Sequence, residues 1–170
     1  MTRRHDRLAL WLLFGVYLVL LAWIILFKLH LPFIGRDDMR GIKLIPFVAS
    51  EGFGASSPLE VVGNAAIFIP LGVYLRTLTR WTMPALIVAI ALASVALEVA
   101  QFALAVGSSD LTDVIVNTAG GLAGIGVVAL VRRRERIVDA CAVGTLLGLI
   151  AVGLFIGSFP HLAPGQVLTF

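Results

Sequence analysis

Acidic and amide side chains recur at helical spacing in three separate stretches of this sequence. Residues three, four or seven positions apart lie on one face of an α-helix, so each stretch predicts a polar stripe along one helix. The three stripes are Glu60 and Asn64; Ser94, Glu98 and Gln101; and Asp110, Asp113 and Asn117. Side chains of these types could bind a polar ligand, hold a cation or transfer a proton.

Glu98 stands out because it is the only charged residue in an apolar stretch from about 82 to 106. An acidic side chain at the centre of a bilayer costs about 2.5–3.5 kcal/mol on a translocon scale. Such carboxylates usually face the interior of a helix bundle and have a partner there. We therefore expect Glu98 to have a functional role or to be coupled to another group.

The other polar residues also have structural interpretations. Asp110 and Asp113 could cap a helix and complement its dipole. The amide side chains could form hydrogen bonds between helices; these are Asn64, Gln101 and Asn117.

The composition excludes an ordinary soluble protein. Of 170 residues, 59% are hydrophobic and 14% are charged, with a mean hydropathy of +1.02, whereas soluble domains are about 45–50% apolar and about 25% charged. The net charge of +3 arises from cations between the apolar runs, which indicates membrane topology rather than nucleic-acid binding. Cys141 is the single cysteine and the three histidines are scattered, so we expect no metal site and no cofactor.

Apolar segments long enough to cross a bilayer predict an all-α, polytopic membrane helix bundle in a single domain, 1–170. The five predicted transmembrane helices span about 8–27, 58–78, 82–106, 110–131 and 137–159. Ser57, Pro58 and Glu60 form a capping box at the start of the second helix. Within that helix, Pro70 lacks a backbone donor and predicts a kink.

Charge placement predicts an N-in/C-out orientation. Nine cations then lie on the cytoplasmic side and four on the outside. All three polar stripes would lie toward the extracytoplasmic end of the bundle. The connection 28–57, which carries Lys43 and the apolar patch 44–48, would lie at the interface on the same side.

Glycines predict where helices pack closely. Gly120 and Gly124 are four residues apart in the fourth predicted helix, and Gly144 and Gly148 repeat this spacing in the fifth. Small residues at this spacing let two membrane helices approach each other.

Four sequence blocks together resemble the VanZ-like membrane protein family. They are Lys43-Leu44-Ile45-Pro46-Phe47; Gly63-Asn64 followed by Phe68-Ile69-Pro70-Leu71-Gly72; Glu98-Val99-Ala100-Gln101; and Asp110-x-x-Asp113-x-x-x-Asn117-x-x-Gly120-Gly121. The resemblance implies a multi-pass protein of the bacterial plasma membrane and cell envelope. The founding member of this family lowers susceptibility to teicoplanin more than to vancomycin. The resemblance also marks Pro46, Pro70, Gly120 and Gly121 as structural positions, to which the spacing adds Gly124.

This chain departs from the family pattern at two positions. Family members often have Asn in place of Lys43 and Arg in place of Ser108. The missing arginine would otherwise balance the acidic residues, and Lys43 could take over part of that role. Ligand preference could therefore differ from that of the founding member.

The leading hypothesis is a membrane protein that reduces the effect of lipophilic glycopeptides, and we do not expect it to be an enzyme. Apolar helix faces would bind the lipid tail of the ligand, and the polar cluster would bind its head. The expected ligand-binding residues are Lys43, Asn64, Glu98, Gln101, Asp110, Asp113 and Asn117. One alternative is an intramembrane enzyme that uses Glu98 and Asp113 as a carboxylate pair on a lipid-linked cell-wall intermediate. Another is a small transporter or a structural membrane partner.

Overall fold

A computed structural model describes residues 2–27, 34–35, 41–48, 56–131 and 134–157 of the chain. In these residues the chain forms five helices and two short strands. In order they are α1 (Thr2–Phe27), β1 (Gly41–Lys43), α2 (Pro58–Leu78), α3 (Met83–Leu104), β2 (Ser108–Asp110), α4 (Leu111–Leu130) and α5 (Arg134–Gly157). The predicted all-α membrane helix bundle is confirmed.

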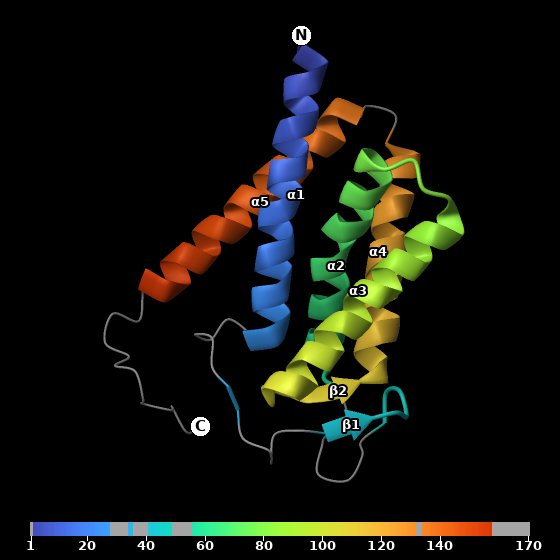
Figure 1. Ribbon diagram of the computed structural model, residues 1–170, viewed down its shortest axis with the longest axis vertical. Helices are drawn as coiled ribbons and strands as arrows, with labels where there is room; N and C mark the ends of the chain where they lie inside the picture. Colours follow the sequence, from blue (N-terminus) through green and yellow to red (C-terminus); the bar gives the residue numbers. More distant parts are fainter. Residues whose placement is uncertain (1, 28–33, 36–40, 49–55, 132–133, 158–170) are drawn as a thin grey trace.

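Successive helices run in opposite directions along the bundle (Figure 1). The helices α2, α3 and α4 lie side by side, and α1 and α5 cross each other beside them. Four segments are long and apolar enough to cross a membrane: Arg7–Phe27, Pro58–Leu78, Met83–Leu104 and Leu111–Leu130. In α5, the apolar stretch among the described residues, Asp139–Ile150, is shorter than these spans. A fifth span and the N-in/C-out orientation therefore remain predictions.

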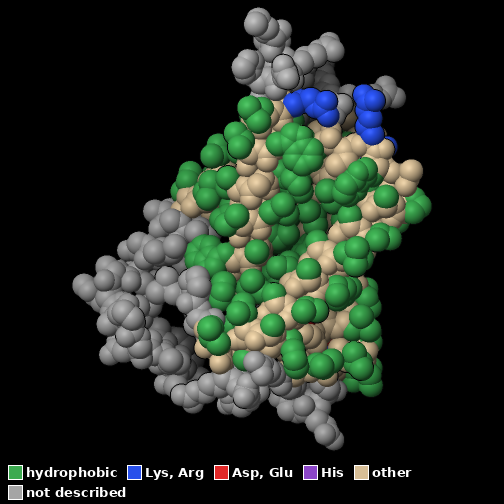
Figure 2. All heavy atoms as spheres, viewed as in Figure 1, with side chains coloured by type: hydrophobic (Ala, Val, Ile, Leu, Met, Phe, Trp, Pro, Cys, Tyr) green, Lys and Arg blue, Asp and Glu red, His purple; other side chains and the backbone are tan. Residues whose placement is uncertain are grey.

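The surface of the bundle is divided by side-chain type. Hydrophobic side chains cover the length of the helices on the face seen in Figure 2, and Lys and Arg side chains gather at one end. The exposed arginines Arg7, Arg76, Arg80 and Arg136 lie at helix ends or just beyond them. An apolar belt with cations at one end is the surface expected of a protein surrounded by lipid.

The closest helix pair in the bundle is α2 with α4. A Cβ atom added to Gly120 would overlap the Ala65 carbonyl, and one added to Gly124 would overlap the Ile69 carbonyl. Both neighbours are backbone atoms of α2, which cannot move aside as a flexible side chain would. The absence of a side chain at these two glycines therefore sets the distance between the two helices.

Gly144 does not follow the packing pattern predicted for α5. A Cβ atom there would meet no other atom within 4 Å, and one at Gly148 would make an ordinary contact of 3.8 Å with Leu20. The prediction of close packing through Gly144 is therefore wrong. Glycine spacing alone does not determine which neighbour a helix face meets.

The helix α2 continues through Pro70. The proline ring removes the backbone donor that would bind the Ala66 carbonyl, and this weakens the hydrogen bonding of that turn. On the same turn, the Tyr17 hydroxyl of α1 donates a hydrogen bond of 2.7 Å to the Ile67 carbonyl. The hydrogen bond from Tyr17 goes to the carbonyl next to the one that has lost its donor, so it fastens α1 to this turn of α2 without replacing the missing bond.

The strands β1 and β2 form a parallel two-stranded sheet that the sequence did not predict. Gly41 pairs with Ser108, Ile42 with Ser109 and Lys43 with Asp110. The sheet joins the loop after α1 to the short connection between α3 and α4 (Figure 1).

We expect Gly124→Ala to destabilise the protein by about 1–3 kcal/mol because the added methyl group must push α2 and α4 apart. Thermal unfolding of the purified protein in detergent, followed by tryptophan fluorescence, measures this change. Gly126→Ala is the matched control, since a Cβ atom at Gly126 meets nothing within 4 Å. Equal melting temperatures for the two variants would contradict the proposed role of Gly124.

Candidate functional site

A buried ion pair lies at the end of the bundle where β1 meets β2. Lys43 Nζ is 2.6 Å from Asp110 Oδ2, and the two side chains are 4% and 7% exposed. The pairing of the strands places these residues opposite each other. Because side chains alternate along a strand, Lys43 points into the protein while its neighbour Ile42 is exposed.

Several further donors surround the Asp110 carboxylate. The Thr112 backbone N–H donates to Oδ1 at 2.8 Å, which makes Asp110 the N-cap of α4. The Ser56 hydroxyl donates to Oδ2 at 3.0 Å. Burial alone would raise the pKa of Asp110, but the hydrogen bonds from Lys43, Thr112 and Ser56 outweigh it and hold that pKa below its ordinary value of 3.8. Asp110 is therefore a carboxylate at neutral pH.

Glu98 connects the end of α3 to the start of α4. Its Oε2 atom accepts a 2.8 Å hydrogen bond from the Asp110 backbone N–H, and its carbonyl accepts one of 2.8 Å from the Ser109 hydroxyl. The first N–H groups of a helix have no partner within the helix, so a carboxylate is a favourable acceptor there. The intramembrane acid predicted from the sequence thus has a backbone partner. We call Lys43, Glu98 and Asp110, with Ser56, Ser109 and Thr112, the polar cluster.

Gln101 and Asn117 connect neighbouring helices. The Gln101 side chain donates 2.9 Å to the Ile25 carbonyl near the end of α1, and the Asn117 side chain donates 2.8 Å to the Ser94 hydroxyl of α3. Both residues are buried. Within the described residues, Gln101 Oε1 and Asn117 Oδ1 have no hydrogen-bond partner. These two oxygens keep an unused capacity to accept a hydrogen bond.

Two of the expected ligand-binding residues are more accessible. Asp113, in the first turn of α4, and Asn64, in the second turn of α2, are half-buried. Asn64 precedes Ala65, whose carbonyl meets Gly120, so α2 and α4 bring the two residues toward the same end of the bundle. A polar ligand could reach these two side chains more easily than the buried ion pair.

Exposed apolar side chains flank Lys43 on the segment that carries it into the polar cluster. This apolar rim consists of Ile42, Leu44, Ile45, Phe47 and Val48. It follows directly from the packing of β1, since Lys43 turns inward and its neighbours turn outward. Pro46 lies in the turn that carries the rim.

Phe47 has a backbone conformation that is unusual for its side chain. Its φ angle is 61°, in the left-handed region, which costs a residue with a Cβ about 1–2 kcal/mol. The Phe47 N–H donates 2.9 Å to the Thr112 hydroxyl, which holds the turn against the start of α4. The phenyl ring is nevertheless 56% exposed. Packing inside the protein therefore does not explain a phenylalanine here, and a role outside it is indicated.

Sequence reasoning missed Ser56, Ser109 and Thr112 in the cluster. Thr112 lies two residues after an N-cap aspartate, and this spacing predicts a hydrogen bond from its backbone N–H to that aspartate. It predicts nothing about the Thr112 hydroxyl. Ser56 and Ser109 carry no such signal. Among the described residues, no group of three or more His, Cys, Asp or Glu side chains could hold a metal ion.

Comparison with known proteins connects this arrangement to one family. Residues 14–132 match the sequence model described as VanZ/LLP1. The chain is 35% identical over 122 residues to "Protein VanZ" of Enterococcus faecium, covering 69% of this chain and 72% of that protein. No solved structure matches the chain.

Removing both members of the ion pair should cost less than the two single losses added together. We expect Lys43→Met or Asp110→Asn alone to destabilise the protein by about 3–5 kcal/mol, because each leaves a buried polar group without its partner. The double variant should lose clearly less than the sum of the two. Unfolding free energies of the four proteins in detergent measure this coupling. Additive losses would mean that the pair does not act as a unit.

The contribution of Asp110 should depend on pH in one direction. Because its folded-state pKa lies below the ordinary 3.8, the carboxylate stabilises the fold at every pH above about 4. This contribution is lost as the pH falls through the folded-state pKa. The difference in melting temperature between the native protein and Asp110→Asn should be constant from pH 8 to about 5 and shrink below about 4. A difference that grows on acidification would contradict this.

Proposed function

The chain belongs to the VanZ/LLP1 family, and we propose that it lowers the susceptibility of a bacterial cell to lipid-tailed glycopeptides of the teicoplanin type. We further propose that it acts from the outer face of the plasma membrane, without catalysing a reaction. The positive-inside rule supports this orientation, since the arginine-rich end would be cytoplasmic and the polar cluster would lie outside.

The observation that carries this proposal is that one segment carries both the exposed apolar rim and Lys43, which is anchored in the polar cluster. A lipid-tailed glycopeptide has two chemically different parts, an acyl chain and a polar peptide head. The rim offers exposed aliphatic and aromatic side chains to the first part. The half-buried polar side chains near the starts of α2 and α4, Asn64 and Asp113, would offer hydrogen-bond partners to the second.

Phe47 supports the same assignment. A left-handed backbone favours glycine or asparagine, yet this turn carries a large exposed ring. At the membrane surface such a ring gains free energy by contacting lipid chains or the tail of a lipophilic ligand. A ligand without a lipid tail would gain no such free energy from the Phe47 ring. The proposal therefore includes a preference for teicoplanin over vancomycin.

The polar cluster would act as a rigid support beneath the rim. Lys43, Glu98 and Asp110 are already joined to each other by hydrogen bonds. This fixes the loop that carries the rim, so that little conformational entropy is lost when a ligand binds.

A sensitive bacterial host that expresses the native chain should show a higher inhibitory concentration of teicoplanin with little change for vancomycin. Glu98→Gln, at matched membrane levels, should lose most of this protection because the charge at the base of the cluster is removed. Asp139→Asn is the control, since Asp139 is an exposed acid in α5. Equal protection against both drugs would rule out tail recognition, and unchanged protection in Glu98→Gln would exclude this carboxylate from the function.

Phe47→Gly separates stability from function. Glycine tolerates the left-handed backbone, so we expect the free energy of unfolding to stay the same or to rise by up to about 1–2 kcal/mol. The melting temperature should stay the same or rise with it. Teicoplanin protection should nevertheless fall because the ring is missing. Thermal unfolding and susceptibility are measured on the same variant. Full protection by a stable Phe47→Gly protein would remove the ring from the ligand site.

A further inference from the structure

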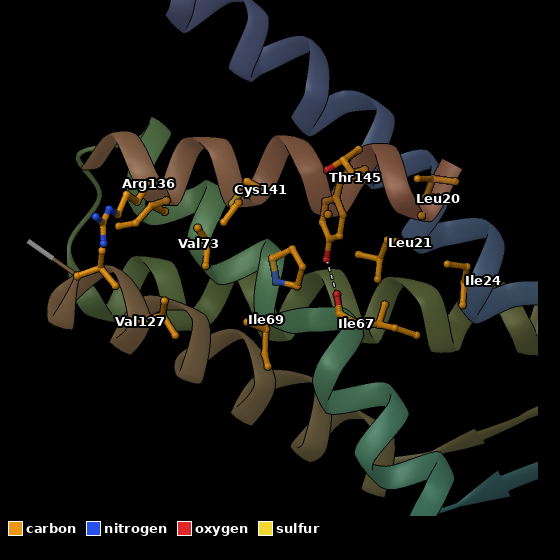
Figure 3. A pocket seen from close by; sticks show the side chains of 17 residues that line it. Leu20, Leu21, Ile24, Ile67, Ile69, Val73, Val127, Arg136, Cys141 and Thr145 are labelled. Carbon is orange, nitrogen blue, oxygen red and sulfur yellow. Dashed lines mark hydrogen bonds between the residues drawn. The ribbon is translucent and has the colours of Figure 1, made fainter. Parts of the chain in front are cut away.

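A cavity lies among the helices, and none of the residues of the polar cluster lines it. It has a volume of about 600 Å³ and is formed by α1, α2, α4 and α5 (Figure 3). Aliphatic side chains such as Leu21, Ile69 and Val127 make up most of its wall. Its volume is typical of a ligand site, about 300–1,000 Å³. We call it the helix cavity.

The few polar groups on the wall already have partners. The Tyr17 hydroxyl donates to the Ile67 carbonyl, which is the dashed line in Figure 3. The Thr145 hydroxyl forms a 2.8 Å hydrogen bond with the Tyr74 hydroxyl. Water inside the cavity would find few partners, and an apolar site of this kind favours an apolar occupant.

One end of the helix cavity is cationic. Arg136 lines it and is the only charged side chain among the described residues that do so. Figure 3 shows Arg136 at one extreme of the cavity, with Leu20 and Ile24 toward the other. The exposed arginines among the described residues lie at this same end of the bundle (Figure 2). Arginine at the edge of a membrane helix places its guanidinium among lipid phosphates while its stem stays in apolar surroundings.

The α5 wall of the cavity is long enough for an acyl chain. Its α5 wall extends from Arg136 to Gly148, which corresponds to about 18 Å at about 1.5 Å per residue. The hydrocarbon core of a bilayer is about 30 Å thick, so one leaflet takes up roughly half of it. A wall of this length can accommodate most of an acyl chain that enters at the Arg136 end.

We propose that the helix cavity holds one acyl chain of an anionic phospholipid, with the phosphate bound by Arg136. Gly144 is part of this site, because a Cβ atom there would point into open space. Glycine at this position leaves room for the chain where a longer side chain would occupy it. The site goes beyond the proposed function and does not depend on it, since none of the residues of the polar cluster or the apolar rim lines the cavity.

The test uses the full chain, delipidated in detergent and reconstituted with equal amounts of phosphatidylglycerol and phosphatidylcholine. After mild extraction, native mass spectrometry counts the lipids that each chain retains. The native protein should retain one phosphatidylglycerol. Gly144→Leu should lose it because the side chain fills the cavity. Arg136→Gln should lower the preference for phosphatidylglycerol about fivefold.

Two matched variants serve as controls. Gly126→Leu makes the same change where a Cβ also meets open space but outside the cavity lining. Arg80→Gln removes an exposed arginine that does not line the cavity. Both should retain the lipid as the native chain does. Equal retention of the two lipids by the native chain, or unchanged retention in Gly144→Leu, would overturn the proposal.

Cys141 gives an independent readout because it is the single cysteine of the chain and lines the cavity. Loading with phosphatidylglycerol should slow its reaction with N-ethylmaleimide, and loading with phosphatidylcholine should not. The same labelling rate with either lipid would contradict occupation of the cavity by an anionic phospholipid. Neither measurement involves an antibiotic, so failure here is distinguishable from failure of the proposed function.

Discussion

Inside a bilayer, a backbone N–H or carbonyl group has no water to bind, and each must find a partner within the protein. This constraint explains most of the polar contacts between elements in the structure. The Gln101 amide binds a carbonyl at the end of α1, and the Tyr17 hydroxyl binds one in the proline-containing turn of α2. Glu98 accepts the N–H that begins α4. Residues that look like the components of an active site thus first complete the hydrogen bonding of helix ends.

The second determinant of the fold is the close approach of α2 and α4. Where glycine replaces a side chain, the two backbones come into direct contact, and dispersion forces act over many atoms at once. This contact fixes the start of α4, and with it Asp110, relative to α2. Part of the polar cluster is therefore built on the most closely packed pair of helices, which suits a site whose side chains must stay in place.

The sequence predicts the parts of this structure that depend on neighbours along the chain. Ser57, Pro58 and Glu60 place the start of α2, where the Ser57 hydroxyl accepts a hydrogen bond from the Glu60 N–H as a capping box requires. Asp110 is likewise recognisable as an N-cap. The polar stripe containing Glu98 is visible because a charge in an apolar run is rare.

Features that depend on contacts between distant residues could not be predicted in this way. Nothing in residues 41–43 alone indicates a strand, because its partner lies in a different connection and the pair is only three residues long. The helix cavity depends on the angle at which α5 crosses α1. Gly144 faces this cavity although the four-residue spacing of Gly144 and Gly148 is typical of close helix packing. The sequence pattern shows which face of a helix carries small or polar residues, but tertiary packing determines which element that face contacts.

The parallel pairing of β1 and β2 has a consequence for biogenesis. Lys43 and Asp110 are 67 positions apart, and the helices α2 and α3 lie between them in the chain. During synthesis the lysine leaves the ribosome long before the aspartate, so the ion pair forms only after α2 and α3 have been threaded into the membrane. Contacts between residues so far apart form late, because the intervening chain must first be ordered. Closure of this small sheet would then be the last step of assembly at that end of the bundle, and a quality-control protease could distinguish a finished molecule from an incomplete one by whether this segment is still open.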